Sequence, residues 1–313
     1  MRIFKETNFQ FMQIRRVPFT ISMVLVAISL LSIIIHGGPR YSIDFKGGSL
    51  IELKFEDKSD SLAAISVPID DIRDVFNSQN IEAADIRYYG SNQDIAAQVD
   101  NTLTADTEKM TELYSALRAK FPDYKLIERR VETVGPKIGG ELVMSAIWAI
   151  LVSMVLILIY IMFRFELRFG IGAVIALFHD VIITIGLFSL LDIEISIPVI
   201  AAVLTIIGYS LNDTIVVFDR IRENMKSFSR QVKNYAELVN RSINETLSRT
   251  IVTSGTTLIV VIILYFFGGE IIKDFALALI IGVVIGTYSS IFVASPILVE
   301  WQERSVVAAP AKK

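Results

Sequence analysis

Six apolar runs, each long enough to cross a bilayer, constrain this 313-residue chain more than any other feature. The hydrocarbon core of a membrane needs roughly 20 apolar residues in helical form. Four of the runs hold no charged residue, one is broken only by His179-Asp180 and one only by Asp213. The runs are Val17–Ile35, Leu142–Phe163, Phe169–Leu191, Ile195–Phe218, Thr250–Gly269 and Phe275–Val299. The sequence therefore predicts a polytopic α-helical membrane protein with six transmembrane helices, which excludes a cytosolic enzyme.

The chemistry open to the chain is limited by what it lacks. Without cysteine it has no disulfides, no thiolate catalysis and no cysteine-based metal site. Its two histidines, His36 and His179, are too few for a histidine-rich metal site, and no GxxxxGK[ST] run would cradle a nucleotide phosphate. No long basic patch with interleaved aromatic residues favours nucleic acid. We expect no catalytic residue, metal or cofactor, and no nucleic-acid partner.

Lys and Arg are concentrated on one side of the predicted spans. They occur in the N-terminal arm (Arg2, Lys5, Arg15, Arg16), between spans two and three (Arg164, Arg168), after span four (Arg220, Arg222, Lys226, Arg230, Lys233, Arg241, Arg249) and in the tail (Arg304, Lys312, Lys313). Because such residues favour the cytoplasmic side, both termini are predicted to be cytoplasmic. No Ala-x-Ala site follows the first span, so we expect an uncleaved anchor.

About half of the charged residues lie between spans one and two. This distribution divides the chain into a cytoplasmic arm (1–16), transmembrane helix 1 (17–36), an external domain (37–141), transmembrane helices 2–6 (142–299) with a cytoplasmic loop (219–249), and a cytoplasmic tail (300–313). Two predictions stay open for this loop: an amphipathic helix at the membrane interface, or a solvated segment.

The external segment switches to short alternating patterns with turn signals. Strands are predicted at Tyr41–Phe45, Ser49–Phe55, Asp85–Tyr89, Asp94–Val99 and Lys125–Val134, and helices at Pro68–Gln79 and near Asp106–Lys120. The order β-β-α-β-β-α-β indicates a ferredoxin-like α+β domain with an extra leading strand. Its carboxylates are scattered as on a solvated surface, so this domain is expected to bind a partner and not to catalyse a reaction.

Ionisable residues inside hydrocarbon are costly, so they are functional candidates by default. Asp180 lies near the middle of span three, Asp213 lies in the cytoplasmic third of span four, and Arg249 comes just before span five at a similar depth. One interpretation is that Asp213 carries protons and that Arg249 controls its charge. The alternative is that Arg249 extends to the interface and Asp213 makes a static bond. His179-Asp180 has the same two interpretations, proton transfer or a static interhelical bond.

Small residues recur at helical spacing in the last span, at Gly282 and Gly286. Small residues let helix backbones approach closely in membranes, so close packing is the expected role of both glycines.

Several runs resemble the SecD/SecF protein-export membrane family, within the resistance-nodulation-division superfamily. They are Asp44-Phe45-Lys46-Gly47-Gly48, Val134-Gly135-Pro136, Phe165-Glu166-Leu167-Arg168-Phe169, His179-Asp180, Gly208-Tyr209-Ser210-Leu211-Asn212-Asp213-Thr214, Phe218-Asp219-Arg220-Ile221-Arg222-Glu223-Asn224, Leu247-Ser248-Arg249-Thr250, Thr253-Ser254 and Gly286-Thr287-Tyr288-Ser289-Ser290. They cover nearly the whole chain in the family's order, and those after span three are similar to the SecF branch in particular.

The resemblance implies half of a transporter of the bacterial inner membrane that pairs with SecD. Such a pair is expected to use the proton-motive force to promote export of unfolded polypeptides after the SecA motor and the SecYEG channel, with YajC or YidC as further subunits. Protons would be the coupling ion, with no cofactor. The resemblance assigns the functional intramembrane pair to Asp213 and Arg249, with Asn212 and Thr253 as neighbouring candidates.

Two other classes of function stay open from the residues alone. One is a proton-driven exporter of small molecules or lipids, although such chains usually carry twelve spans and two large external domains. The other is a scaffold that only stabilises a translocon, which would have no need for buried charge. A neighbouring gene for a second six-span protein would favour the export interpretation.

Overall fold

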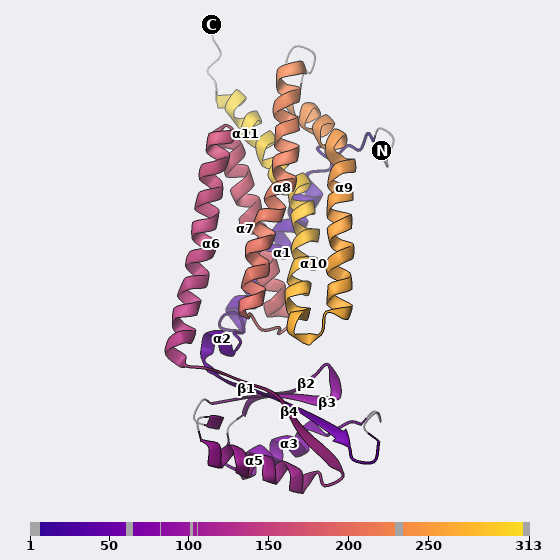
Figure 1. Ribbon diagram of the computed structural model, residues 1–313. Helices are drawn as coiled ribbons and strands as arrows, with labels where there is room; N and C mark the ends of the chain where they lie inside the picture. The colour runs from indigo at the N-terminus through magenta and orange to yellow at the C-terminus, as the bar shows by residue number, and fades with distance from the viewer. Residues whose placement is uncertain are drawn as a thin grey trace. The chain divides into compact units, whose positions relative to one another are not determined.

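The computed structural model describes residues 7–60, 65–81, 83–100, 103–104, 106–228 and 234–308 (Figure 1). The chain divides into two compact units. The helical unit comprises Met1–Arg40 and Trp148–Lys313, and the α/β unit comprises Tyr41–Ile147.

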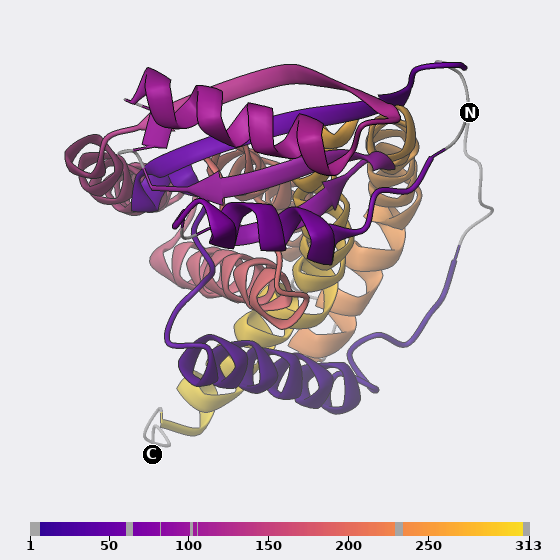
Figure 2. The ribbon, with the colours of Figure 1, turned by 90° about the horizontal axis from the view of Figure 1, so that it is seen from below.

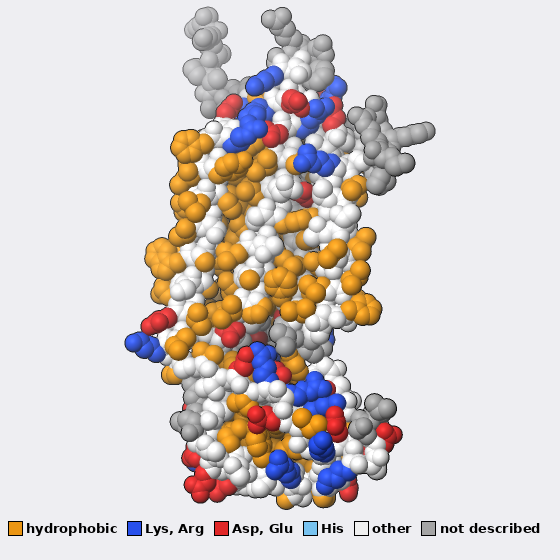
Figure 3. Space-filling view, viewed as in Figure 1, with side chains coloured by type: hydrophobic (Ala, Val, Ile, Leu, Met, Phe, Trp, Pro, Cys, Tyr) orange, Lys and Arg blue, Asp and Glu red, His pale blue; other side chains and the backbone are white. Residues whose placement is uncertain are grey.

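Within the described residues, six helical segments are long and apolar enough to cross a membrane, which confirms the six predicted spans. They are α1 (Arg16–Ile35), α6 (Pro136–Arg164), α7 (Leu167–Leu190), α8 (Ile197–Phe228), α9 (Tyr235–Phe267), and a sixth formed by α10 (Glu270–Ser289), the π-helical turn η1 (Ser290–Ala294) and α11 (Ser295–Ala308). Apolar side chains dominate the visible flank of this unit, and Lys and Arg gather at one end of it (Figure 3).

Buried glycines bring α10 against α8. A Cβ built at Gly286 would lie 2.9 Å from Ser210 Cβ, and one built at Gly282 would overlap Ile206. The expected close packing at both glycines is therefore present. The centre of the unit is formed by α7, α8 and α10, whereas α1, α6 and α9 expose most of their apolar residues.

The α/β unit has the predicted ferredoxin-like order. It runs β1 (Gly48–Asp57), α3 (Ile69–Ser78), β2 (Ala83–Tyr89), β3 (Ser91–Val99), α5 (Thr107–Lys120) and β4 (Tyr124–Val134). The strands form an antiparallel sheet in the order β2-β3-β1-β4, and α3 and α5 lie side by side on one face (Figure 2). Ile51, Leu53 and Phe55 of β1 project into the core beneath these helices.

The extra leading strand predicted at Tyr41–Phe45 is wrong. Residues Ile43–Lys46 form the short helix α2. Ser42 caps its N-terminus, since the Ser42 hydroxyl accepts a 3.3 Å hydrogen bond from the Asp44 amide. Gly47 ends α2 with φ +76°, and a Cβ there would lie 2.8 Å from Pro136 Cα. The Asp44-Phe45-Lys46-Gly47-Gly48 run thus makes a tight turn against the start of α6, because only glycine fits that approach and that backbone angle.

Two further glycines near this turn, Gly48 and Gly135, have different surroundings. Gly48 has φ +124°, and a Cβ on it would lie 3.2 Å from the Val99 carbonyl oxygen, so the start of β1 also requires glycine. A Cβ on Gly135 would meet nothing within 4 Å, and nothing in the structure explains that glycine.

The predicted loop at 219–249 is mostly helical. It is helical on either side of residues 229–233, because α8 extends to Phe228 and α9 begins at Tyr235. Buried Asn224 joins the two extensions, since its amide donates to Ser242 at 2.9 Å and to Glu245 at 2.8 Å. Residues 229–233 lie outside the described part of the chain.

Candidate functional site

Asp213 lies on α8 where α9 and α10 converge, and only 2% of its surface is exposed. Ser254 of α9 donates a 3.0 Å hydrogen bond to Asp213 Oδ2, and Thr287 Oγ1 of α10 lies 3.5 Å from the same oxygen. The two hydroxyls also touch each other, with a Thr287–Ser254 oxygen distance of 2.7 Å. The carboxylate is therefore held from two neighbouring helices by neutral hydroxyl groups.

Arg249 lies on α9, just over one turn before Ser254, and its side chain is exposed. Its charge acts on the Asp213 carboxylate, but within the described chain no hydrogen bond or ion pair joins the two side chains. Thr253 lies close to the same carboxylate. Its hydroxyl donates back to the Arg249 and Thr250 carbonyl oxygens, each at 3.0 Å. Asn212, by contrast, is exposed on the surface of α8.

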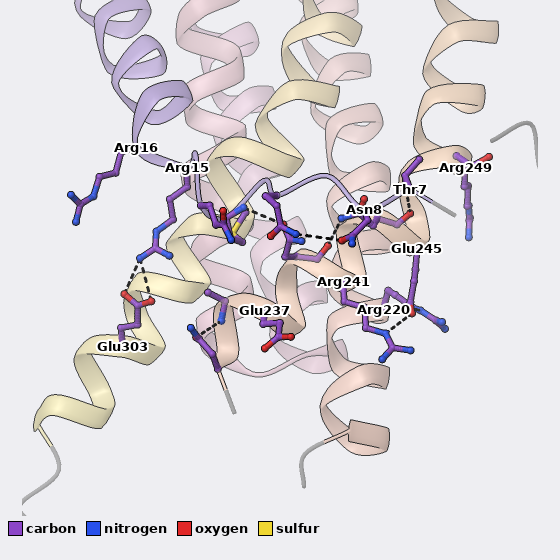
Figure 4. Close-up of a pocket in the computed structure, with 18 of the residues that line it drawn as sticks. Thr7, Asn8, Arg15, Arg16, Arg220, Glu237, Arg241, Glu245, Arg249 and Glu303 are labelled. Atoms are coloured by element: carbon purple, nitrogen blue, oxygen red, sulfur yellow. Dashed lines mark hydrogen bonds and ion pairs between the residues drawn. The ribbon is translucent and has the colours of Figure 1, made fainter. Parts of the chain in front are cut away.

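A cavity of about 1440 Å³ opens beside Arg249 at the end of the helical unit where the N-terminal arm lies (Figure 4). Its lining includes Arg249, Val252 and Thr253, so it extends to the neighbours of Asp213 but not to Asp213 itself. Five arginines and three glutamates contribute to the lining: Arg15, Arg16, Arg220, Arg241, Arg249, Glu237, Glu245 and Glu303. A polar cavity of this size has room for many water molecules.

The N-terminal arm forms one wall of this cavity and is fastened to two helices. Asn244 of α9 pairs with the backbone of Phe9, accepting from its amide and donating to its carbonyl oxygen, each at 2.8 Å. Arg15 Nη2 donates to both carboxylate oxygens of Glu303 of α11, at 2.9 and 3.2 Å (Figure 4). The arm therefore bridges α9 and α11 across the cavity wall.

A second buried carboxylate, Asp180 of α7, is fully enclosed. Its Oδ2 accepts hydrogen bonds from Ser210 of α8 at 2.5 Å and from Ser289 of α10 at 2.8 Å. Its Oδ1 lies 2.8 Å from His179 Nδ1. The structure thus places His179 and Asp180 together but apart from the bonded group around Asp213.

Four hydroxyl residues of these two sites were not selected as candidates from the sequence: Ser210, Ser254, Thr287 and Ser289. Each stands inside an apolar run, and Ser210 precedes Asp213 by one helical turn. Because Ser210 bonds Asp180 of α7 and not Asp213 on its own helix, spacing along one helix gave no signal for these contacts. Within the described residues, no three His, Asp or Glu side chains gather in a way that would hold a metal ion.

Fold and site together define a polytopic helical membrane protein with buried carboxylates at its helix junctions. Two family patterns match the chain: "Protein export membrane protein SecD/SecF, C-terminal" over residues 114–304 and "SecD/SecF GG Motif" over residues 32–58. The chain belongs to the SecD/SecF protein-export membrane family and is a protein translocase subunit of the SecF type.

Two relatives illustrate how far the similarity extends. The chain is 45% identical to protein translocase subunit SecF of Desulfurispirillum indicum over 300 residues, covering 95% of this chain and 92% of that one. It is also 45% identical to protein translocase subunit SecF of Rhodothermus marinus over 312 residues, covering 97% of each.

Among solved structures, the chain resembles SecDF, described as a translocon-associated membrane protein, from Thermus thermophilus. The TM-score is 0.83 at 41% identity, over 96% of this chain and 39% of that one. A second structure of SecDF, in a super-membrane-facing form, gives a TM-score of 0.71 at 38% identity. The chain spans about two fifths of the length of these SecDF chains.

Proposed function

We propose that this subunit acts with SecD and uses the proton-motive force to promote export of unfolded polypeptides after SecA and SecYEG have begun it. Asp213 is the proton-carrying group and Arg249 sets its charge. The observation that carries the proposal is the enclosure of Asp213 at the junction of α8, α9 and α10, where its direct partners are neutral hydroxyls. Burying an ionisable group inside a membrane costs free energy, so its presence there indicates a functional role.

The cavity supports access of water to one side of this carboxylate. Thr253 both lines the cavity and lies near Asp213, so the cavity ends close to the carboxylate. Arg249 stands at the same wall without an ion pair to Asp213. A change in the rotamer of Arg249, or a small rotation of α9, would bring the guanidinium to the carboxylate and favour its deprotonated form. Withdrawal of the guanidinium would favour protonation.

The partner proposed for the helical unit is SecD, and the proposed contact is the outer face of α8. Ala201, Thr205, Gly208 and Asn212 form an exposed stripe of small and polar residues along that helix. A Cβ on Gly208 would meet no atom of this chain within 4 Å. Small and polar residues favour helix–helix contact over lipid. The solved SecDF chains are more than twice as long as this chain, which supports a second membrane half at this face.

The basic end of the helical unit is proposed to face the bacterial cytoplasm, with both termini there and the α/β unit in the periplasm. This orientation follows from the positions of Lys and Arg. SecYEG is the proposed channel partner, with YajC or YidC as further subunits. The subunit is proposed to do mechanical coupling and no enzymatic reaction, with protons as the coupling ion and no cofactor.

The test is an export assay with the purified subunit and SecD in vesicles that contain SecYEG and SecA. A half-translocated chain is prepared, ATP is removed, and an imposed proton gradient is switched on or off. The proposal predicts that the gradient completes export only when both subunits are present. Gradient-independent completion would favour a scaffold, and proton-coupled efflux of a small molecule without effect on the chain would favour an exporter.

A further inference from the structure

The carboxylate of Asp180 joins three helices at one point. A single oxygen, Oδ2, accepts from Ser210 of α8 and from Ser289 of α10, at 2.5 and 2.8 Å, while the residue itself belongs to α7. No part of Asp180 is exposed. Because both hydroxyls donate to the same oxygen atom, the carboxyl group ties α8 to α10 at one point.

Both serines lie next to residues of the Asp213 site. Ser210 precedes Asp213 by one turn of α8, and Ser289 follows Thr287 by two residues on α10. Gly286 of α10 packs directly against Ser210, because a Cβ on Gly286 would lie 2.9 Å from Ser210 Cβ. A shift of α10 along α8 that broke the Asp180 bonds would therefore also change the 3.5 Å separation of Thr287 and Asp213.

The network also reaches α1. His179, whose Nδ1 bonds Asp180, stacks beside the ring of Tyr288 with centroids 6.4 Å apart. The Tyr288 hydroxyl donates to the Pro18 carbonyl oxygen at 2.6 Å and accepts from Ser22 at 3.1 Å. Asp180 thus joins α7, α8 and α10 directly, and α1 is connected to them through Tyr288 and His179.

We propose that Asp180 is a positioning residue for the Asp213 site. Its carboxylate fixes the register of α10 against α8, and this register sets the hydroxyl environment in which Asp213 gains and loses its proton. Asp180 itself does not carry the transported proton, because neither it nor any of its three bonding partners lines the cavity beside Arg249, whereas Thr253 next to Asp213 does. This inference rests on the proposed function of Asp213.

The test measures Asp213 directly, by carbodiimide labelling of its protonated carboxyl group across a pH series. Peptide mapping separates labelling at Asp213 from labelling at Asp180, and the sample is the assembled complex with SecD. Asp180→Asn is compared with Thr184→Val, a matched control one turn along α7 that is also buried and whose hydroxyl bonds only the Asp180 carbonyl oxygen, at 2.8 Å.

Asp180→Asn is expected to move the midpoint pH of Asp213 labelling by about one unit and to slow gradient-driven export roughly tenfold. Thr184→Val is expected to leave both unchanged. The double variant Ser210→Ala/Ser289→Ala, which keeps the carboxylate, is expected to move the midpoint in the same direction. Each variant is also combined with Thr287→Val, and effects on the midpoint that do not add are expected, because the residues act on one site.

An assembled Asp180→Asn complex with the wild-type midpoint would overturn the inference. If that variant fails to assemble, a wild-type midpoint in Ser210→Ala/Ser289→Ala would overturn it equally. The proposed function fails separately: an Asp213→Asn complex that keeps gradient-driven export would remove the relay, while a shifted midpoint in Asp180→Asn would still support the positioning role.

Discussion

Ser254 of α9 donates a hydrogen bond of 3.0 Å to the carboxylate of Asp213 on α8. Through Thr287, which lies 2.7 Å from Ser254, the same group reaches α10. The chemical identity of these partners matters, because hydroxyls can bond either protonation state of a carboxyl group whereas a fixed arginine would favour only the anion. A group held in this way can change charge without leaving its place.

Removing the Ser254 hydroxyl should weaken the coupling of the proton gradient to export without unfolding the helical unit. We expect Ser254→Ala to lower gradient-driven export roughly tenfold, since a hydrogen bond to a charged group is worth about 1.5–3 kcal/mol. Ser254→Thr keeps the hydroxyl and should stay closer to wild type. The control is Thr257→Val on the same helix, whose hydroxyl bonds only the Thr253 carbonyl oxygen. Equal export by Ser254→Ala and the control would contradict this account of the site.

Substitutions at two glycines distinguish helix packing within the subunit from the proposed contact with SecD. Gly286→Leu should lower the melting temperature of the subunit, because Ser210 occupies the space that the side chain needs and overpacking costs about 1–3 kcal/mol. Gly208→Leu should leave that temperature unchanged and reduce the yield of SecD on co-purification, because its Cβ position is open in this chain. A Gly208→Leu subunit that still assembles fully with SecD would show that SecD does not bind the outer face of α8.

The α/β unit carries a carboxyl group whose burial makes stability depend on pH. Glu52 of β1 is 6% exposed, and its closest cation, Arg130, is 3.9 Å away. Burial raises the pKa of Glu52 above its ordinary value of 4.5, more than the charge of Arg130 lowers it. The folded state therefore holds this proton more tightly than the unfolded state. The stability this provides is complete below about pH 4.5 and is lost as the pH rises through the raised pKa.

Glu52→Gln should accordingly melt at a higher temperature than wild type at pH 7, and the two proteins should converge near pH 4. Thermal melts of the full chain in detergent across this range measure the difference. The exposed pair Arg73–Asp70 offers a control, since Asp70→Asn should shift the melting temperature little at either pH. A wild-type protein that gains stability relative to Glu52→Gln on going from pH 4 to pH 7 would contradict the sign of the effect.

The absence of cysteine makes the orientation directly measurable. Ser59→Cys in the α/β unit should react with a membrane-impermeant maleimide added outside intact cells. Glu237→Cys, near the start of α9 at the basic end of the helical unit, should react only after the membrane is opened. Labelling of Glu237→Cys from outside would reverse the proposed topology.

Some of the architecture follows directly from residue patterns. Six spans were predictable because apolar runs of bilayer length with at most one charged residue seldom occur outside membranes. The ferredoxin-like order was predictable from the alternation of apolar residues and from the turn residues. The strand expected at Tyr41–Phe45 failed because a few alternating apolar residues fit a helical turn as well. The Ser42 cap and the approach of Pro136 to Gly47 decide the conformation there, and neither is visible in the pattern.

The candidate site was predictable only in part for a similar reason. Asp213 stands out by cost alone, since a carboxylate in an apolar run needs an explanation. Its partners depend on how α8, α9 and α10 are rotated against one another, and that rotation is set by contacts such as Gly286 against Ser210. Sequence spacing placed Arg249 at the depth of Asp213 but could not show that Ser254 and Thr287 would occupy the direct bonding positions.

The charge partner of Asp213 can be tested independently of its hydroxyl partners. Arg249→Met keeps the apolar stem and removes the charge, so it should assemble with SecD and lose gradient-driven export. Arg249→Lys should retain part of the activity, because a point charge lacks the planar fork that meets a carboxylate with two bonds. Export by Arg249→Met at the wild-type rate would show that the guanidinium has no part in coupling.

Gradient-driven completion of a half-translocated chain by Asp213→Asn tests the central claim most directly. Asparagine keeps the shape and can still accept from Ser254, but it has no titratable proton. The account predicts a complex that assembles with SecD, supports the ATP-driven start of export at the wild-type rate, and shows no response to the imposed proton gradient. An Asp213→Asn complex that completes export with the full gradient response would contradict the account.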